Sequence, residues 1–323
     1  MKIIIIGAGI SGLSAAIALK QTLPSIQIEI YEIRPSPSTI GGAVNLTPNA
    51  LRYLSSLKVL PHLKNTACRV RSIEIISHRT GSNLAELSFD IPGSDGFQAL
   101  RAKRSELHAA LTDTWYTDLG GEIIYDAKLS SIETASSGLV EAKFTVKGAP
   151  VTKTVDLLLG CDGIHSFVRT SFVEPDRAEI YSGIASAYGI TSVSEEDKSN
   201  LPFDATGVFS SRRGSLLMSY TNPEKTMLYM AAVMETKEIS SREGWKVKGS
   251  DQEAVKKEIL GRFCQTGPLA DKLKKVVDRV DDWFLYPVYK LPPGGVWSKD
   301  KVLLLGDAAH AVRNLDSPVI LAR

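Results

Sequence analysis

Residues 2–32 read KIIIIGAGISGLSAAIALKQTLPSIQIEIYE, and this stretch decides the fold. The β-branched runs at residues 2–6 and 26–31 predict strands, and the apolar periodicity of residues 11–20 between them predicts a helix. Such a βαβ unit indicates the α/β class. Glycines interrupt the apolar run, and Lys20 ends it before about 20 uninterrupted apolar residues accumulate. We therefore expect no signal peptide, no membrane span and a cytoplasmic location.

Three glycines join the first strand to the helix. Gly7, Gly9 and Gly12 form the pattern G-x-G-x-x-G, and Glu32 stands 20 residues after Gly12, where the second strand ends. In this context the glycines allow a tight turn and let a pyrophosphate approach the helix N-terminus, while the acid accepts hydrogen bonds from ribose hydroxyls. The pattern predicts a dinucleotide site. The alternative is a glycine-rich turn without a ligand.

The composition excludes several classes of protein. The chain has 323 residues, which favours two domains or one domain with an insertion. Hydrophobic residues at 43% and charged residues at 23% are typical of soluble globular proteins. A net charge of +2 without dense basic clusters gives no sign of nucleic-acid binding. Cys68, Cys161 and Cys264 are widely spaced and the histidines are isolated, so we predict neither a disulfide framework nor a metal site.

The middle of the chain predicts a second sheet. Residues 73–78 and 84–90 alternate apolar and polar side chains around a turn, which is the pattern of an antiparallel hairpin. Residues 181–233 contain strand after strand with little helical periodicity, and residues 251–263 and 269–280 predict amphipathic helices. An antiparallel sheet with helices after it fits these patterns best.

Two later segments repeat one arrangement. Residues 157–169, LLLGCDGIHSFVR, and residues 301–311, KVLLLGDAAHA, each run from an apolar strand through Gly and Asp into a predicted helix. Asp162 and Asp307 thus follow the carboxyl ends of strands, where an acid either caps a helix or meets a ligand at the edge of a parallel sheet. The residues alone leave both interpretations open.

Five motifs together resemble those of the FAD-dependent aromatic hydroxylases, the single-component flavin monooxygenases similar to salicylate hydroxylase. In order, they are the glycine pattern with Glu32, IGGAVNLTPNA at residues 40–50, Arg104 in LRAKRSELHAAL at residues 100–111, CDGIHSFVR, and LLLGDAAHA. The resemblance spans nearly the whole chain. It implies cofactor-binding roles for Gly7, Gly9, Gly12 and Glu32 at the ADP half of FAD, for Gly42 and Ala43 along the flavin, and for Arg104, Asp162 and Asp307.

The resemblance also implies the architecture. We expect a three-layer FAD/NAD(P)-binding, Rossmann-like domain with an inserted antiparallel-sheet substrate domain. The FAD-binding domain would comprise residues 1–72, 97–172 and 283–323, and the substrate domain residues 73–96 and 173–282.

The activity implied is a monooxygenase reaction. FAD would be reduced by NADH or NADPH, and one atom of O2 would be transferred to a small aromatic or polyketide-like substrate. An epoxidase of an isoprenoid alkene is an alternative with the same cofactor, and a non-catalytic flavoprotein remnant is another. An NAD-dependent dehydrogenase ranks last because it gives no reason for GDAAHA. The sequence does not indicate an oligomeric state.

Two tyrosines are candidates for catalysis. Tyr188 stands where relatives often have an arginine, and Tyr220 matches a position where the family often has tyrosine. Either phenol would hydrogen-bond a substrate oxygen; the alternative is that both pack within the sheet.

The last segment departs from the family pattern. After GDAAHA the family continues with proline and a Gly-Gln-Gly loop, whereas this sequence reads VRNLDSPVILAR with Pro318 and no such loop. We therefore expect a C-terminally truncated flavin site, with weak FAD retention.

Overall fold

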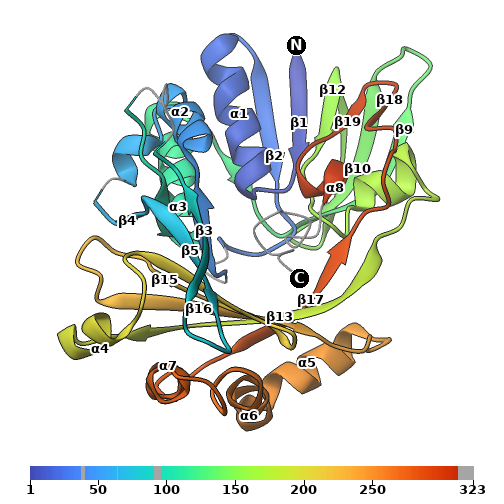
Figure 1. Cartoon of the computed structure of the whole chain (residues 1–323). Helices are drawn as coiled ribbons and strands as arrows, with labels where there is room; N and C mark the ends of the chain where they lie inside the picture. Colours follow the sequence, from blue (N-terminus) through green and yellow to red (C-terminus); the bar gives the residue numbers. More distant parts are fainter. Residues whose placement is uncertain (38–40, 64, 91–95, 312–323) are drawn as a thin grey trace.

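The computed structural model describes residues 1–37, 41–63, 65–90 and 96–311. Two large sheets dominate it, one at the top and one at the bottom of Figure 1. The upper sheet has six strands, and β1 pairs in parallel with β2 on one side and with β12 on the other. Across the sheet the order is β18 (Ser298–Lys299), β19 (Val302–Leu304), β12 (Leu157–Gly160), β1 (Lys2–Ile6), β2 (Gln27–Tyr31) and β8 (Ile123–Ile124).

The six-stranded sheet is the middle of three layers. One face packs on α1 (Ile10–Thr22) and α3 (Arg104–Asp113), with Ile3 and Ile5 of β1 in that core. Ile4 and Ile6 point the other way, because side chains alternate along a strand. They pack on an antiparallel sheet of β9 (Ala127–Thr134), β10 (Val140–Val146) and β11 (Ala149–Val155). The expected three-layer α/β architecture is confirmed.

A small sheet lies between the two large ones. It consists of β3 (Ala43–Leu46), β7 (Leu100–Lys103) and β4 (Cys68–Arg69), and β3 and β4 flank β7 in antiparallel fashion. After β3 comes α2 (Pro48–Ser56), and Thr47 caps it by accepting a hydrogen bond from the backbone of Ala50. Leu100 and Ala102 point into the core beneath α1 and α3, so Arg101 points to the opposite side.

The lower sheet has seven strands. Their order is β17 (Phe284–Lys290), β13 (Ile180–Ser192), β16 (Met227–Glu235), β15 (Gly214–Tyr220), β14 (Thr206–Ser211), β5 (Ser72–Ser77) and β6 (Asn83–Ser88). The predicted hairpin is β5 and β6, and it joins β14 through a parallel pair, so this sheet is not wholly antiparallel. The parallel pair arises because the hairpin comes from a distant part of the chain rather than from a turn beside β14.

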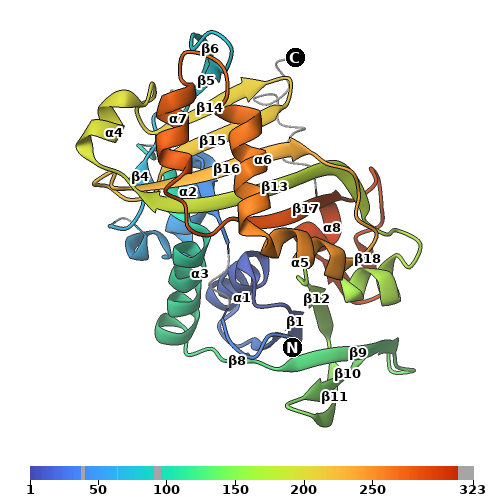
Figure 2. The same cartoon turned by 90° about the horizontal axis from the view of Figure 1, so that it is seen from below.

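Helices cover the outer face of the seven-stranded sheet. Figure 2 shows α6 (Gln252–Phe263) and α7 (Ala270–Val277) lying across its strands, with α5 (Arg242–Ser250) beside β17. Their apolar residues meet alternate residues of the strands in the largest core of the molecule. The short α4 (Glu195–Asn200) follows β13. The opposite face of the sheet is thereby turned toward the small sheet and β1.

The division into two domains stays a proposal. Strand β17 pairs with β13 in the seven-stranded sheet, which extends this sheet as far as Lys290. We therefore now propose that the substrate domain ends near residue 290 rather than at 282. The predicted departure at residues 312–323, including Pro318, lies outside the described residues.

Candidate functional site

The carboxyl ends of the parallel strands meet at one edge of the six-stranded sheet. Gly7 follows β1 with a φ of +100°, and a Cβ there would lie 2.6 Å from the carbonyl oxygen of Cys161. A Cβ at Gly12 would lie 2.0 Å from the carbonyl oxygen of Gly7. The protein itself therefore requires both glycines. Gly9 differs, because a Cβ there would meet no described atom within 4 Å, which leaves room for a ligand.

Three predicted cofactor residues line one hollow beside this loop. They are Gly9, Glu32 and Arg104. Glu32 is buried, and its carboxylate accepts hydrogen bonds of 2.9 Å from the backbone N–H groups of Ala8 and Arg34. These bonds fix the acid at the end of β2. The hollow is completed by Ala8, Arg34, Ser36, Pro37, His108 and Tyr125.

Gly42 and Ala43, predicted to lie along the flavin, start the small sheet. The backbone N–H of Arg104 donates to the carbonyl oxygen of Gly42 at 2.8 Å, so two predicted motifs are tied together. A Cβ at Gly42 would lie 2.6 Å from the phenol oxygen of Tyr229, so this backbone touches the seven-stranded sheet. The Tyr229 phenol also hydrogen-bonds the backbone at Ala43, and burial raises its pKa.

Aromatic side chains form a row on the sheet face that Ala43 contacts. Tyr188 of β13 has its ring centroid 6.1 Å from that of Tyr229, 5.2 Å from Phe284 and 5.9 Å from Tyr286. We call Tyr229, Tyr188, Phe284 and Tyr286 the aromatic row. Burial raises the pKa of Tyr188, so its phenol is neutral at physiological pH and can donate a hydrogen bond.

Tyr220 does not join this row. Along β15 it alternates with Leu217 and shares the helix-covered core with Met218 and Phe203. Its buried hydroxyl has no hydrogen-bond partner among the residues that the structure describes, and burial raises its pKa to about 12. The Tyr220 side chain thus lies on the sheet face opposite to Tyr188, away from the aromatic row, and its catalytic role stays a prediction.

Asp162 follows β12 next to the glycine loop. A Cβ at Gly7 would lie 3.2 Å from its Cα atom. Its carboxylate accepts hydrogen bonds from the Ser166 hydroxyl at 2.5 Å and from the backbone N–H of Val168 at 3.0 Å. Burial raises its pKa, while these hydrogen bonds lower it. Asp162 thus caps the turn after it, and it also stands where a ligand on Gly7 would arrive.

Asp307 begins the short α8 (Asp307–His310) and is exposed. Gly306 before it has a φ of +62°, and a Cβ there would lie 2.1 Å from the hydroxyl oxygen of Ser11. The Gly-Asp motif therefore abuts the start of α1. The structure brings Asp307 to the same sheet edge as Gly7 and Asp162, as the resemblance implied.

A buried arginine joins the two aspartate motifs. Arg169 is 0% exposed, and its guanidinium donates to four acceptors. These are the carbonyl oxygens of Ile164 at 2.6 Å, Arg177 at 3.0 Å and Ala308 at 3.0 Å, and the carboxylate of Glu179 at 3.1 Å. Protein acceptors therefore satisfy the guanidinium group, and Arg169 holds α8 against the loop after β12.

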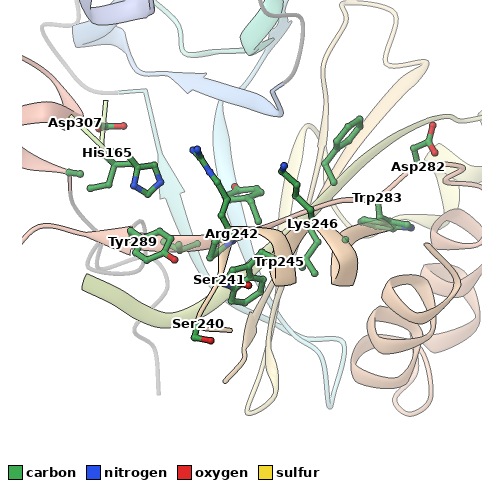
Figure 3. Close-up of a pocket in the computed structure, with 18 of the residues that line it drawn as sticks. His165, Ser240, Ser241, Arg242, Trp245, Lys246, Asp282, Trp283, Tyr289 and Asp307 are labelled. Atoms are coloured by element: carbon green, nitrogen blue, oxygen red, sulfur yellow. The ribbon is translucent and has the colours of Figure 1, made fainter. Parts of the chain in front are cut away.

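A large pocket opens between these motifs and α5. Its volume is about 1070 Å³. His165 and Asp307 lie on one side, while Arg242 and Lys246 extend from α5 on the other (Figure 3). Phe284 and Tyr286 line it as well, so the pocket continues into the aromatic row. Its lining combines cations with aromatic rings.

These residues fit the expected cofactor. Gly9 has open space beside it and Glu32 is a buried acid at the end of β2, and these two features are the ones that bind the ADP half of a dinucleotide; the hollow itself measures about 20 Å³. Ala43 packs against Tyr188 and Tyr229 of the aromatic row, and Gly42 lies against the Tyr229 phenol. Sequence reasoning missed His108, whose Nε2 donates to the Ala8 carbonyl oxygen at 2.7 Å. Its spacing of four residues from Arg104 on one helix is a signal that could have found it.

Comparisons with known proteins agree with this geometry. Residues 5–46 match the family model of the NAD(P)-binding Rossmann-like domain. The chain is 25% identical over 319 residues to 6-hydroxynicotinate 3-monooxygenase of Pseudomonas fluorescens, covering 97% of this chain and 77% of that protein. It is 24% identical over 317 residues to the FAD-dependent urate hydroxylase of Klebsiella pneumoniae, covering 96% and 75%.

A solved structure shows the same fold. The crystal structure of Klebsiella pneumoniae HpxO in complex with FAD and uric acid superposes with a TM-score of 0.79 at 22% identity, over 96% of this chain and 74% of that one. The homologues of this chain are thus FAD-dependent aromatic hydroxylases, and the resemblance that the five motifs indicated is confirmed. Within the described ranges, every helix is too short or too polar to cross a bilayer.

Proposed function

We propose that this homologue of the FAD-dependent aromatic hydroxylases is itself an FAD-dependent monooxygenase that uses NAD(P)H and O2 to hydroxylate a small aromatic substrate in the cytoplasm. The observation that carries the proposal is the convergence of Gly9, Glu32 and Arg104 on one hollow, with Gly42 tied to Arg104 at its rim. Similarity over nearly the whole chain supports it.

The chain's own residues would hold the cofactor along the sheet edge. Glu32 would take the ribose, the N-terminus of α1 behind Gly9 would take the pyrophosphate, and Asp307 would meet the ribityl and phosphate region. Gly42 and Ala43 would border the ring system. When bound, FAD accepts reducing equivalents from NAD(P)H and activates O2 for transfer of one oxygen atom.

The aromatic row would form the opposite wall of the reaction space. Tyr188 is 7% and Tyr229 is 6% exposed, so they exclude water from the ring that they face. Their raised pKa values keep both phenols protonated near neutral pH, and a protonated phenol donates to a substrate oxygen. The row would position the ring of the substrate by stacking, and the phenols would orient its hydroxyl.

The large pocket would admit the reductant. Arg242 and Lys246 supply positive charge for the phosphates of NAD(P)H, and Trp245 and Tyr286 supply rings for its bases. The same lining disfavours the alternative of an isoprenoid epoxidase, because an alkene chain offers no charge to these cations. A long apolar pocket would favour that alternative.

The first test is the visible absorbance spectrum of the purified chain, before and after incubation with FAD and gel filtration. Near-stoichiometric flavin bands and oxidation of NADH or NADPH coupled to O2 uptake with phenolic acids would support the proposal. A folded circular dichroism spectrum without bound flavin would instead favour the non-catalytic remnant.

A matched pair of variants makes the test specific. Arg104→Met should lower FAD occupancy at least tenfold, because a cation at the hollow is lost. Arg52→Met, on the exposed surface of α2, should leave occupancy unchanged. Equal occupancy in both variants would contradict the assignment of the hollow.

A further inference from the structure

The pocket beside α5 wraps around one edge of the seven-stranded sheet. Strand β17 ends the strand order of this sheet, and Phe284 and Tyr286 of that strand belong to the aromatic row. Leu285 between them packs against the helix-covered core on the other face. A Cβ at Gly249 of α5 would lie 3.6 Å from the Cβ of Leu285. Since all four residues line the pocket, it runs from the aromatic row around β17 to α5.

Two cations of α5 extend into this pocket. Arg242 is the first residue of the helix and Lys246 follows four residues later, so both side chains occupy one face of α5 (Figure 3). Within the described ranges Arg242 has no carboxylate partner, because Glu243 beside it pairs with Lys246 at 3.1 Å. That pair is exposed and contributes little to stability. Both cations are therefore available to an anion.

The carboxylates that line the pocket lie away from these cations. Figure 3 shows Asp307 beside His165 across the pocket, and Asp282 beside Trp283. The part of the pocket at the start of α5 is thus positively charged.

Unpaired donors accompany the cations. The Ser241 hydroxyl oxygen accepts from the backbone N–H of Gly244 at 2.9 Å, so its own O–H can still donate. Trp245 also lines the pocket and is 4% exposed, and its Nε1–H has no acceptor among the described residues. A buried donor without an acceptor requires an explanation. Cations and donors together suit a phosphate monoester, which carries about two negative charges near pH 7.

The route of the pocket decides which end of a dinucleotide reaches α5. The nicotinamide ring must meet the flavin, which Gly42 and Ala43 would border, and the aromatic row leads from Ala43 to the pocket. The adenosine end then lies around β17 at α5. NADH and NADPH differ at this end by one group, the phosphate on the 2′ oxygen of the adenosine ribose.

We propose that Arg242 and Lys246, with the Ser241 hydroxyl, form a 2′-phosphate subsite that makes NADPH the preferred reductant of this chain. The inference rests on the proposed function for its reaction and deepens it by choosing between the two reductants. Arg242 binds two phosphate oxygens through its guanidinium fork, and Ser241 donates to the third. Lys246 neutralises the remaining charge.

The first test is isothermal titration calorimetry of the full chain with adenosine 2′,5′-bisphosphate and with 5′-AMP. Wild-type protein should bind the bisphosphate roughly tenfold more tightly, because charge-assisted hydrogen bonds hold the added phosphate. Arg242→Met should remove most of this preference, and Arg242→Lys should keep part of it, because a lysine retains charge without the fork. The control Arg71→Met removes an exposed arginine outside the pocket and should leave the preference unchanged.

A competition experiment distinguishes a nucleotide site from a free-anion site. Inorganic phosphate at the concentration of the bisphosphate should leave the bisphosphate bound. Displacement by inorganic phosphate alone, or equal binding of the bisphosphate and 5′-AMP by wild-type protein, would overturn the proposal.

Steady-state oxidation of NADPH and NADH by the holoenzyme gives the second test. Wild-type kcat/KM should be roughly tenfold higher for NADPH, and Arg242→Met should bring the ratio close to one. Its unfolding temperature should equal that of wild type, since Arg242 has no carboxylate partner to lose within the described ranges. An NADPH preference that survives in both Arg242→Met and Lys246→Met, or a wild-type preference for NADH, would overturn the subsite and leave the proposed activity standing. Arg242-dependent binding of the bisphosphate by a chain that retains no FAD would support the subsite and overturn the proposed activity.

Discussion

Two buried arginines in different parts of this molecule behave in opposite ways. Arg169 donates to four acceptors and joins the two aspartate motifs, whereas Arg101, 5% exposed, donates to none that the structure describes. Protein acceptors satisfy the guanidinium of Arg169, whereas the guanidinium of Arg101 has no acceptor among the described residues. Burial alone therefore does not distinguish a charge that stabilises the fold from one that does not; the count of partners does.

The largest expected effect comes from removing the guanidinium of Arg169. Arg169→Met leaves three carbonyl oxygens without their donor and leaves the Glu179 carboxylate with His165 as its remaining partner, so we expect a loss of about 3–5 kcal/mol in the free energy of unfolding. Urea denaturation followed by circular dichroism measures it. Arg71→Met is the exposed control. A stability equal to wild type would show that Arg169 does not hold the two aspartate motifs together.

The glycine loop gives the next largest effect. Gly12→Ala places a Cβ 2.0 Å from the Gly7 carbonyl oxygen, and overpacking of this kind costs about 1–3 kcal/mol. Gly9→Ala meets no described atom within 4 Å, so it should keep the fold and lower only the affinity for FAD. Thermal unfolding and FAD titration of both variants check this. If Gly9→Ala loses stability instead, the space beside Gly9 does not belong to a ligand.

A pair of Tyr→Phe variants tests the difference between the two faces of the seven-stranded sheet. Tyr188→Phe removes a donor from the proposed reaction space and should lower kcat/KM by about fivefold, since one hydrogen bond contributes about 1 kcal/mol. Tyr220→Phe removes a buried hydroxyl that has no partner, so both activity and stability should be unchanged or slightly improved. Steady-state kinetics and thermal unfolding distinguish the two, and the reverse ranking would restore Tyr220 as the catalytic candidate.

The smallest effect concerns pH. The pKa of Asp162 is raised by burial, so the folded state holds this proton to higher pH than the unfolded state. Its contribution to stability is complete below the unfolded pKa, near 4, and falls as pH rises through the folded value. Relative to Asp162→Asn, wild-type protein should therefore lose stability as pH rises from 3.5 to 7. A difference that grows with pH would mean that hydrogen bonds to the carboxylate outweigh its burial.

The sequence predicted the parts of the site that depend on local chain geometry. Gly7, Gly12 and Glu32 are readable because a strand, a turn and a helix within 31 residues determine their surroundings. The upper sheet and the β5–β6 hairpin were predicted for the same reason. Local patterns do not show which sheet face meets which neighbour, so the sequence could not separate Tyr220, in the helix-covered core, from Tyr188 on the opposite face.

The proximity of Arg101 to Tyr229 could not be read from the sequence. These residues belong to different sheets and lie 128 positions apart. Alternation along β7 predicts that Arg101 points away from Leu100 and Ala102. It cannot predict that Arg101 pairs with no acidic side chain among the described residues on the opposite face. A missing partner is a property of the assembled molecule.

The parallel pairing of β1, β12 and β19 also dictates an order of events during synthesis. Strands β1 and β2 emerge within the first 31 residues, whereas β19 pairs with β12 only when Val302 has been made. At typical elongation rates of about 5–20 residues per second, the edge of the nascent sheet stays uncovered for roughly 15–55 seconds. Over that interval the ribosome builds the whole lower sheet. Recovery of folded protein from cells should therefore respond to growth temperature and chaperone supply, because an open apolar strand edge invites association with other chains.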